Sequence, residues 1–306
     1  MGILGTIRVA DQVPMRGAVA GTRIRRMSTD IARKASARFP ARRAVITGGA
    51  SGLGLAMAGL LAAEGWKLAL LDRDEARLAE ARQRLAGAAE LRTYALDTGD
   101  WEAVRDAVDD FANAHGGLDL ALNSAGVAVA GLFLETPIQD WDWIIRINLV
   151  GVAHSCRAEL PHMIRAGGGL VINVASAAGF ASGSEMSAYN ATKAAVIALS
   201  ETLAQEMDEH HVHVAAAMPG FFRTRLLENA RAPAKSMGFA RKLMDGSNLE
   251  ADVVAADLLA RALKGRHHLV VPRPYRALWL FKRLAPGRFI RMMTGVRRKM
   301  LAKRRG

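Results

Sequence analysis

The sequence of 306 residues contains a single cysteine, Cys156. One cysteine excludes a disulfide framework within the chain and any metal site that needs several cysteines. Cys156 falls in a stretch with helical character, so we expect a packed free thiol rather than a reactive nucleophile. This cysteine usage indicates a reducing compartment, and a cytoplasmic location is the simplest expectation.

Long apolar runs and metal-ligand spacing are also missing. No segment approaches the ~20 apolar residues that a membrane-spanning helix needs. The N-terminal segment is rich in arginine, as transit peptides are, but it lacks the apolar region of a secretory signal. The histidines at 210, 211 and 213 do not share one helical face, and the adjacent pair at 267 and 268 diverges. We therefore expect no metal site.

Acidic residues are absent from residues 266–306, which carry thirteen Lys/Arg. Residues 1–43 carry ten Lys/Arg and two Asp. Between these ends, residues 44–265 hold nineteen basic and twenty-seven acidic residues, a net charge of −8. Such an acidic body argues against a nucleic-acid-binding protein, whereas the basic ends favour contact with anionic surfaces or simple solubility.

What is present is an alternation of strand-like and helix-like segments, without an internal repeat. It predicts an α/β fold: a doubly wound parallel sheet of about seven strands, with helices on both faces. We expect one domain over residues 42–272, a basic extension over 1–41 and a basic amphipathic tail over 273–306. The apolar runs that predict strands lie at 44–47, 67–71, 91–96, 118–123, 169–175, 212–218 and 268–271.

A glycine-rich segment directly follows the first apolar run. Gly48, Gly52 and Gly54 fall where a strand would turn into a helix. Glycine permits such a turn and lets backbone N–H groups approach a pyrophosphate at the helix N-terminus. The spacing differs from the general G-x-G-x-x-G fingerprint, and glycine in a tight turn can also be purely structural. The segment predicts a dinucleotide site only in combination with other residues.

Asp72 is the first of these residues, because it ends the next apolar run. A carboxylate there can accept hydrogen bonds from adenosine ribose hydroxyls and would repel a 2′-phosphate, which favours NAD. Arg73 leaves NADP as an alternative, since a guanidinium can accept that phosphate. Asp72 could equally be a helix N-cap, and the two roles are compatible.

Tyr189 and Lys193 supply the candidate chemistry. They lie four residues apart on a predicted helix, so both face the same way. An ammonium beside a phenol is expected to lower the phenol's pKa and to make Tyr189 a usable general acid or base. Ser176 ends an apolar run, where its hydroxyl can hydrogen-bond a substrate oxygen. In isolation, the Tyr–Lys spacing would also fit an ordinary amphipathic helix.

These motifs resemble the short-chain dehydrogenase/reductase family over about residues 42–272. The segment 123–126, Asn-Ser-Ala-Gly, is similar to the family's Asn-Asn-Ala-Gly. The resemblance implies a catalytic tetrad of Asn148, Ser176, Tyr189 and Lys193, with Asn148 linking the lysine to solvent through a water. It implies a homo-oligomer, a dimer or a tetramer. It also implies cofactor contacts from Thr47, Gly48, Ser51, Gly52, Leu53, Gly54, Asp72, Arg73, Asp97, Asn123, Ala125, Gly126, Tyr189, Lys193, Pro219, Gly220 and Thr224.

The resemblance therefore predicts an oxidoreductase that moves a hydride between a nicotinamide and an alcohol or ketone. A catalytically silent nicotinamide-binding sensor or a membrane-surface scaffold is the alternative. Residues 221–250 interrupt the alternation and would shape the substrate pocket, unless they pack a subunit interface. Their apolar side chains predict a medium-to-large apolar substrate. The candidate walls are Phe221, Phe222, Leu226, Leu227, Met237, Phe239, Leu243 and Met244.

The tail after the last predicted strand mixes twelve Lys/Arg with aromatic and aliphatic residues. This composition is typical of a helix that lies on an anionic lipid surface. An oligomer contact and a helical lid over the substrate mouth are the other interpretations. Pro286-Gly287 should divide the tail into two pieces. Because the last strand should end near Val271, we expect the sheet to form without the tail.

Overall fold

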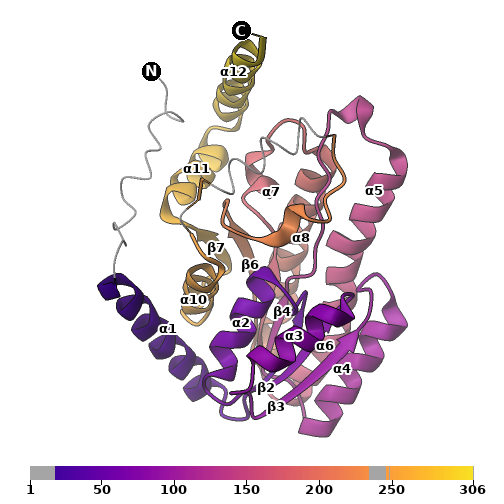
Figure 1. Cartoon of the computed structure of the whole chain (residues 1–306), viewed down its shortest axis with the longest axis vertical. Helices are drawn as coiled ribbons and strands as arrows, with labels where there is room; N and C mark the ends of the chain where they lie inside the picture. The colour runs from indigo at the N-terminus through magenta and orange to yellow at the C-terminus, as the bar shows by residue number, and fades with distance from the viewer. Residues whose placement is uncertain (1–17, 234–245, 248, 306) are drawn as a thin grey trace.

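The structure is a computed structural model that describes residues 18–233, 246–247 and 249–305. Its centre is a parallel sheet of seven strands in the order β3-β2-β1-β4-β5-β6-β7 (Figure 1). The predicted doubly wound α/β fold and its seven strands are confirmed. The strands are β1 (Arg43–Thr47), β2 (Lys67–Asp72), β3 (Glu90–Ala95), β4 (Leu120–Asn123), β5 (Gly169–Val174), β6 (Val212–Pro219) and β7 (His268–Val271).

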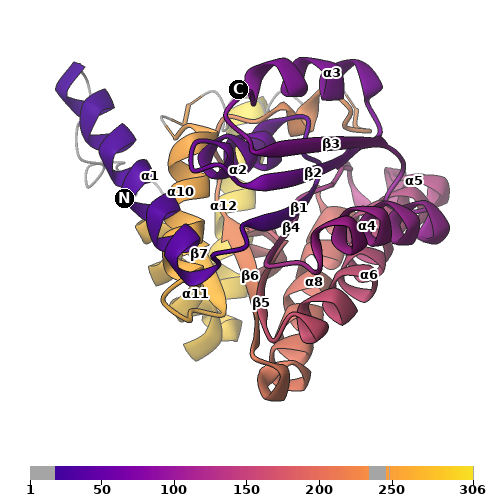
Figure 2. The ribbon, with the colours of Figure 1, turned by 90° about the horizontal axis from the view of Figure 1, so that it is seen from below.

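Helices cover both faces of this sheet (Figure 2). The apolar strand residues explain the arrangement, since every residue of β1 and β4 is buried and both faces must be covered. One core cluster joins the sheet to α1 (Ala18–Arg38), α2 (Gly52–Ala62), α3 (Glu75–Arg84) and α10 (Ala251–Ala262). The other joins it to α4 (Trp101–His115), α6 (Gly151–Arg165) and α8 (Ser187–Glu206).

Local signals set several helix boundaries. Asp100 caps α4, and its Oδ1 accepts a hydrogen bond from the Ala103 N–H at 3.1 Å. The predicted helical stretch 137–166 is divided into α5 (Ile138–Ile145), the π-helical turn η2 (Arg146–Val150) and α6. Such π turns insert an extra residue and occur often at functional sites. Here the turn contains Asn148, the candidate catalytic amide.

The basic N-terminal segment contributes to the body through α1. Ala32 and Ala35 have no exposed surface, and α1 packs against α10 and α2. The indole Nε1 of Trp66 donates a hydrogen bond to the Ser36 hydroxyl at 3.0 Å, and both side chains are buried. This helix was not expected from the sequence, since its arginine-rich composition masks a short apolar stripe.

The C-terminal tail forms two helices, α11 (Arg273–Leu284) and α12 (Pro286–Arg305). Ala285 lies between them with φ −141° and ψ 62°, so the division falls at Pro286 as expected. The rings of Phe281 and Phe289 lie 5.8 Å apart across this break. None of the helices within the described residues is long and apolar enough to cross a membrane. The short elements are η1 (Phe133–Glu135), α7 (Ala178–Ala181), η3 (Asp208–His210) and η4 (Arg225–Leu227).

Candidate active site

A cavity of about 800 Å³ lies at the carboxyl ends of the strands. Residues that follow β1, β2, β4, β5 and β6 line it, together with side chains of α8, η4 and both tail helices. In this sheet the chain leaves β1 toward β2 on one side, while β4 lies on its other side. Parallel α/β sheets bind ligands at such a switch point.

The glycine-rich turn after β1 is built for close backbone approach. Gly48 has φ +65°, and a Cβ on Gly54 would lie 2.2 Å from the Gly48 carbonyl oxygen. Neither position accepts a side chain without a backbone shift. Ser51 is the N-cap residue of α2, but its side chain accepts no hydrogen bond from the first turn of the helix. The first N–H groups of α2 therefore face the cavity as a site for an anion, which fits the pyrophosphate of a dinucleotide.

Asp72 lies in the cavity wall at the end of β2. Its Oδ2 accepts a hydrogen bond from the Ala50 N–H and its Oδ1 from the Asp74 N–H, each at 3.2 Å. The N-cap of α3 is Asp74, whose side chain accepts from the Arg77 N–H. Asp72 is therefore not the helix cap, and its carboxylate ties the glycine-rich turn to the start of α3. Arg73 also lines the cavity.

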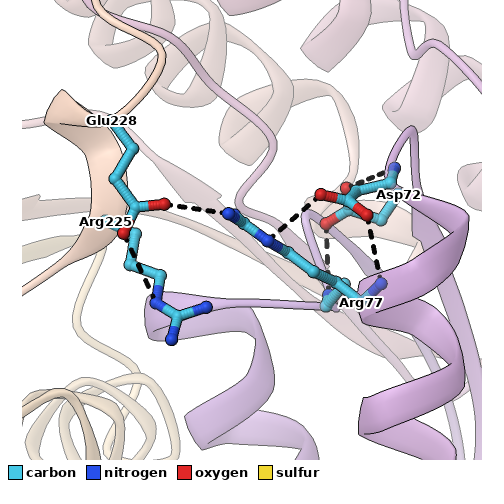
Figure 3. A network of polar contacts seen from close by, with 6 residues as sticks. Asp72, Arg77, Arg225 and Glu228 are labelled. Carbon is cyan, nitrogen blue, oxygen red and sulfur yellow. Dashed lines mark hydrogen bonds and ion pairs between the residues drawn. The ribbon is translucent and has the colours of Figure 1, made fainter.

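Arg77 joins this end of the cavity to η4 (Figure 3). Its Nη2 lies 2.9 Å from Glu228 Oε2, and its Nε lies 3.1 Å from Asp74 Oδ2. The hydrogen bond to Glu228 is the main cause that raises the pKa of Arg77. Arg225 also approaches Glu228, at 3.6 Å. The sequence did not reveal this bridge, because its partners are 151 positions apart.

Three predicted cofactor contacts, Thr47, Asn123 and Gly54, lie outside the cavity lining. Thr47 is buried, and its Oγ1 accepts hydrogen bonds from the N–H groups of Ser124 and Ala125 at 3.2 and 3.3 Å. Asn123 is fully buried and points away from the cavity into the core. The remaining predicted cofactor contacts do line the cavity: Gly48, Ser51, Gly52, Leu53, Asp72, Arg73, Asp97, Ala125, Gly126, Tyr189, Lys193, Pro219, Gly220 and Thr224.

Gly54 is likewise absent from the lining, since it packs within the turn. Gly54 and Thr47 thus shape the loops on either side of the site. A side chain that supports a loop and one that faces a ligand produce the same sequence signal, and only the direction of the side chain separates them. That direction follows from packing and could not be read from spacing.

Tyr189, Ser176 and Lys193 meet in the cavity wall. Tyr189 is 6% exposed, and burial raises the pKa of its phenol to about 12, opposed by the hydrogen bond with Ser176. Burial also lowers the pKa of Lys193 to about 8. The Lys193 ammonium lies 5.8 Å from the Tyr189 ring centroid and donates to the Val174 carbonyl at 2.8 Å. The pKa of Tyr189 is therefore raised and not lowered as expected, because burial is the largest cause and only the hydrogen bond with Ser176 opposes it.

Asn148 is fully buried in the π turn. Its Oδ1 accepts from the Val127 N–H at 2.8 Å, and its Nδ2 donates to the Val127 carbonyl at 2.9 Å. The Asn148 amide and the Lys193 ammonium both lie next to Gly126. A Cβ at Gly126 would be 3.3 Å from Asn148 Oδ1 and 3.5 Å from Lys193 Nζ. The amide thus holds the loop after β4 against the lysine.

A buried polar network lies behind the site. Asn123 Nδ2 donates to Glu159 Oε2 at 3.0 Å and to Asn173 Oδ1 at 2.9 Å. Glu159 has no exposed surface, its Oε1 has no hydrogen-bond partner, and burial raises the pKa of its carboxyl to about 8. Cys156 belongs to the same network, and burial raises the pKa of its thiol. The expected packed thiol is observed, and it is poorly suited to act as a nucleophile.

The substrate side of the cavity is apolar. Four of the predicted walls line it: Phe221, Phe222, Leu226 and Leu227. The others, Met237, Phe239, Leu243 and Met244, lie outside the described residues. Within the described part of the chain, no group of three or more His, Cys, Asp and Glu side chains could hold a metal ion.

Both tail helices form part of the cavity wall, which fits the interpretation of the tail as a helical lid over the substrate mouth. Pro274, Tyr275 and Leu278 of α11 line the cavity, as do Met293, Val296, Arg297 and Leu301 of α12. The contact is close, since a Cβ on Gly220 would lie 2.4 Å from the Tyr275 ring. The amphipathic pattern of the tail was visible in the sequence, but the surface against which it packs was not.

This sheet, glycine-rich turn and Ser–Tyr–Lys cluster define a dinucleotide-binding α/β oxidoreductase, and the comparisons agree. The family profile for short chain dehydrogenases matches residues 42–235. An uncharacterised oxidoreductase of Thermotoga maritima is 33% identical over 182 residues, covering 59% of this chain and 71% of that protein. The chain therefore belongs to the short-chain dehydrogenase/reductase family, as the motifs predicted.

Solved structures give the same result. A short-chain dehydrogenase/reductase from Burkholderia phymatum in complex with NAD has a TM-score of 0.74 and 30% identity. The match covers 79% of this chain and 92% of that one. A short-chain dehydrogenase from Mycobacterium paratuberculosis bound to NAD has a TM-score of 0.66 and 26% identity, covering 75% and 94%. Relatives of this chain therefore bind NAD in the same fold.

Proposed function

We propose that this protein interconverts an apolar alcohol and its ketone, with NAD as the preferred cofactor and Tyr189 as the general acid and base. The carrying observation is that Tyr189, Ser176 and Lys193 meet in one cavity, between the anion site of α2 and apolar walls. The bound nicotinamide would supply or accept the hydride. The residues of the chain bind the substrate oxygen and move its proton.

Each polar side chain has a defined task in this scheme. In reduction, the Tyr189 hydroxyl donates its proton to the substrate oxygen, and in oxidation the phenolate accepts it. The Ser176 hydroxyl hydrogen-bonds the same oxygen and holds it against the tyrosine. Because burial raises the pKa of Tyr189 to about 12, the phenol is protonated at neutral pH and ready for reduction. Oxidation needs a lower pKa, which cationic neighbours such as Lys193 and an oxidised nicotinamide favour.

The apolar walls predict the substrate class. With Phe221, Phe222 and Leu226 at the cavity, lipid-like, steroid-like or aromatic alcohols should be turned over with a higher kcat/KM than polyols, because burial of apolar surface favours their binding. The measurement is nicotinamide absorbance with a panel of alcohols and ketones and with both cofactors. Higher efficiency on polyols would contradict the proposed substrate class.

Cofactor preference should depend on the charge of Asp72. Asp72→Asn keeps an oxygen that can accept from a backbone N–H but removes the charge that repels a 2′-phosphate. We expect the ratio of kcat/KM for NADP to that for NAD to rise at least about tenfold, since one charge at close range contributes a kcal/mol or more. Asp106→Asn, at an exposed site on α4, should leave the ratio unchanged. A wild-type enzyme that already prefers NADP would contradict this role for Asp72.

A further inference from the structure

The two tail helices separate the substrate cavity from a basic, partly apolar outer surface. On α11, Pro274, Tyr275 and Leu278 face the cavity. Leu280 and Leu284 recur one turn apart on the other side of the helix and are 49% and 83% exposed. An exposed leucine alone needs no explanation, but this pair lies on a helix that also forms the cavity wall.

α12 is divided in the same way. Met293, Val296, Arg297 and Leu301 line the cavity, and their spacing of i, i+3, i+4 and i+8 places them on one stripe. The opposite stripe is basic and exposed, with Arg288, Arg291, Arg298 and Lys299. In Figure 1, α12 projects from the body beyond α11. Ile290, which is 56% exposed, lies near the junction of the two helices and three residues before Met293, so it continues the cavity-side stripe and not the basic one.

We propose that the outer surface of α11 and α12 docks on an anionic lipid bilayer, so that an apolar substrate enters the cavity from the membrane. We name this surface, formed by Arg273, Arg276, Leu280, Arg283, Leu284, Arg288, Arg291, Arg298 and Lys299, the docking face. The entry of an apolar substrate from the membrane rests on the function proposed above. Docking of the protein on the bilayer does not depend on that function.

The charge of the docking face favours an anionic bilayer over a second copy of the protein or a nucleic acid as its binding partner. Residues 273–306 carry twelve Lys/Arg and no acid, so a second copy of the same face would meet strong repulsion. Among the described residues 273–299, none of these cations forms an ion pair with a carboxylate, although Arg283 lies over the Trp279 ring. A nucleic acid would satisfy the charge but would leave Leu280 and Leu284 in water. An anionic bilayer receives both kinds of side chain.

The test is co-sedimentation of the full-length protein with vesicles of equal parts phosphatidylglycerol and phosphatidylcholine. The wild type should bind, and binding should weaken when added salt shortens the screening length from about 8 Å toward about 3 Å. Combined Leu280→Ser and Leu284→Ser should weaken binding by at least about tenfold, because each removes apolar surface from the lipid contact. Turnover of a soluble alcohol should be unchanged, since neither leucine lines the cavity.

The matched control removes apolar surface elsewhere. Phe133, Leu134 and Ile138 are 64%, 93% and 70% exposed on η1 and α5, away from the docking face. Their combined change to Ser should leave vesicle binding intact. Equal binding by the docking-face variant, or loss of binding only in the control, would overturn the proposal. So would a wild type that binds a DNA duplex but not the vesicles, or a self-associated wild type that this variant makes monomeric.

Sedimentation needs no turnover, so the two proposals fail separately. Absence of vesicle binding with normal turnover of an apolar alcohol would remove the docking proposal alone. Vesicle binding without turnover of any alcohol or ketone would remove the proposed function and leave the docking face. With both intact, a long-chain alcohol embedded in the vesicles should be oxidised several-fold more slowly by the docking-face variant than by the wild type.

Discussion

Tyr189→Phe should lower kcat by ~10²–10⁴-fold, the usual contribution of a general acid or base. Phenylalanine keeps the buried ring, which is only 6% exposed, but it has no proton to donate to the substrate oxygen. The glycine-rich turn after β1 and the cavity wall at Asp72 do not depend on the phenol, so NAD should still bind. The measurements are single-turnover hydride transfer and cofactor titration.

Tyr94→Phe is the matched control for this change. The Tyr94 hydroxyl donates a hydrogen bond to Asp110 of α4, and neither residue lines the cavity, so loss of this hydroxyl should leave kcat within about twofold. Activity of Tyr189→Phe within a few-fold of the wild type would exclude Tyr189 as the proton donor. Loss of cofactor binding together with activity would instead indicate that the phenol supports the site structurally.

Glu159→Gln should change how stability depends on pH. Burial raises the pKa of Glu159 from 4.5 to about 8, so the folded state holds a proton that the unfolded chain releases. A carboxyl with a raised folded pKa costs stability as pH rises from its unfolded pKa to its folded pKa, here from about 4.5 to about 8. At ~1.4 kcal/mol per pKa unit, the loss across this window is up to about 5 kcal/mol.

Glutamine cannot ionise, so the variant should lack this decline. Glu159 Oε1 has no hydrogen-bond partner, so an amide nitrogen at that position would also be unpaired, at a cost that is the same at every pH. The diagnostic is therefore the slope: urea unfolding at pH 5 and pH 8 should show a smaller decline in the variant than in the wild type. Glu80→Gln, at an exposed site on α3, should keep the wild-type slope. Equal slopes in all three proteins would mean that Glu159 is ionised in the fold.

The local pattern determined the sheet. Each strand is a short apolar run between turn residues, and a run such as 44–47 carries its own preference for a strand covered on both faces. The glycine-rich turn and the pair Tyr189 and Lys193 were readable for a similar reason. Their geometry follows from backbone freedom and from the helical repeat, both of which act within a few residues.

Tertiary structure decided what depends on contacts between distant segments. Arg77 meets Glu228 only because β2 and β6 end at the same edge of the sheet, and no local spacing encodes that meeting. Asn123 turns into the core because Glu159 and Asn173 offer partners there. The pKa of Tyr189 is set by burial, which the neighbouring Lys193 could not predict.

The tail shows the division most clearly. The sequence alone determined that residues 273–306 are basic and amphipathic, because composition and helical periodicity are local properties. Which side of each helix meets the cavity was decided by packing, with Tyr275 against Gly220 and Met293 in the cavity wall. An amphipathic helix buries its apolar stripe against whatever surface the rest of the chain presents, and that surface exists only in the folded protein.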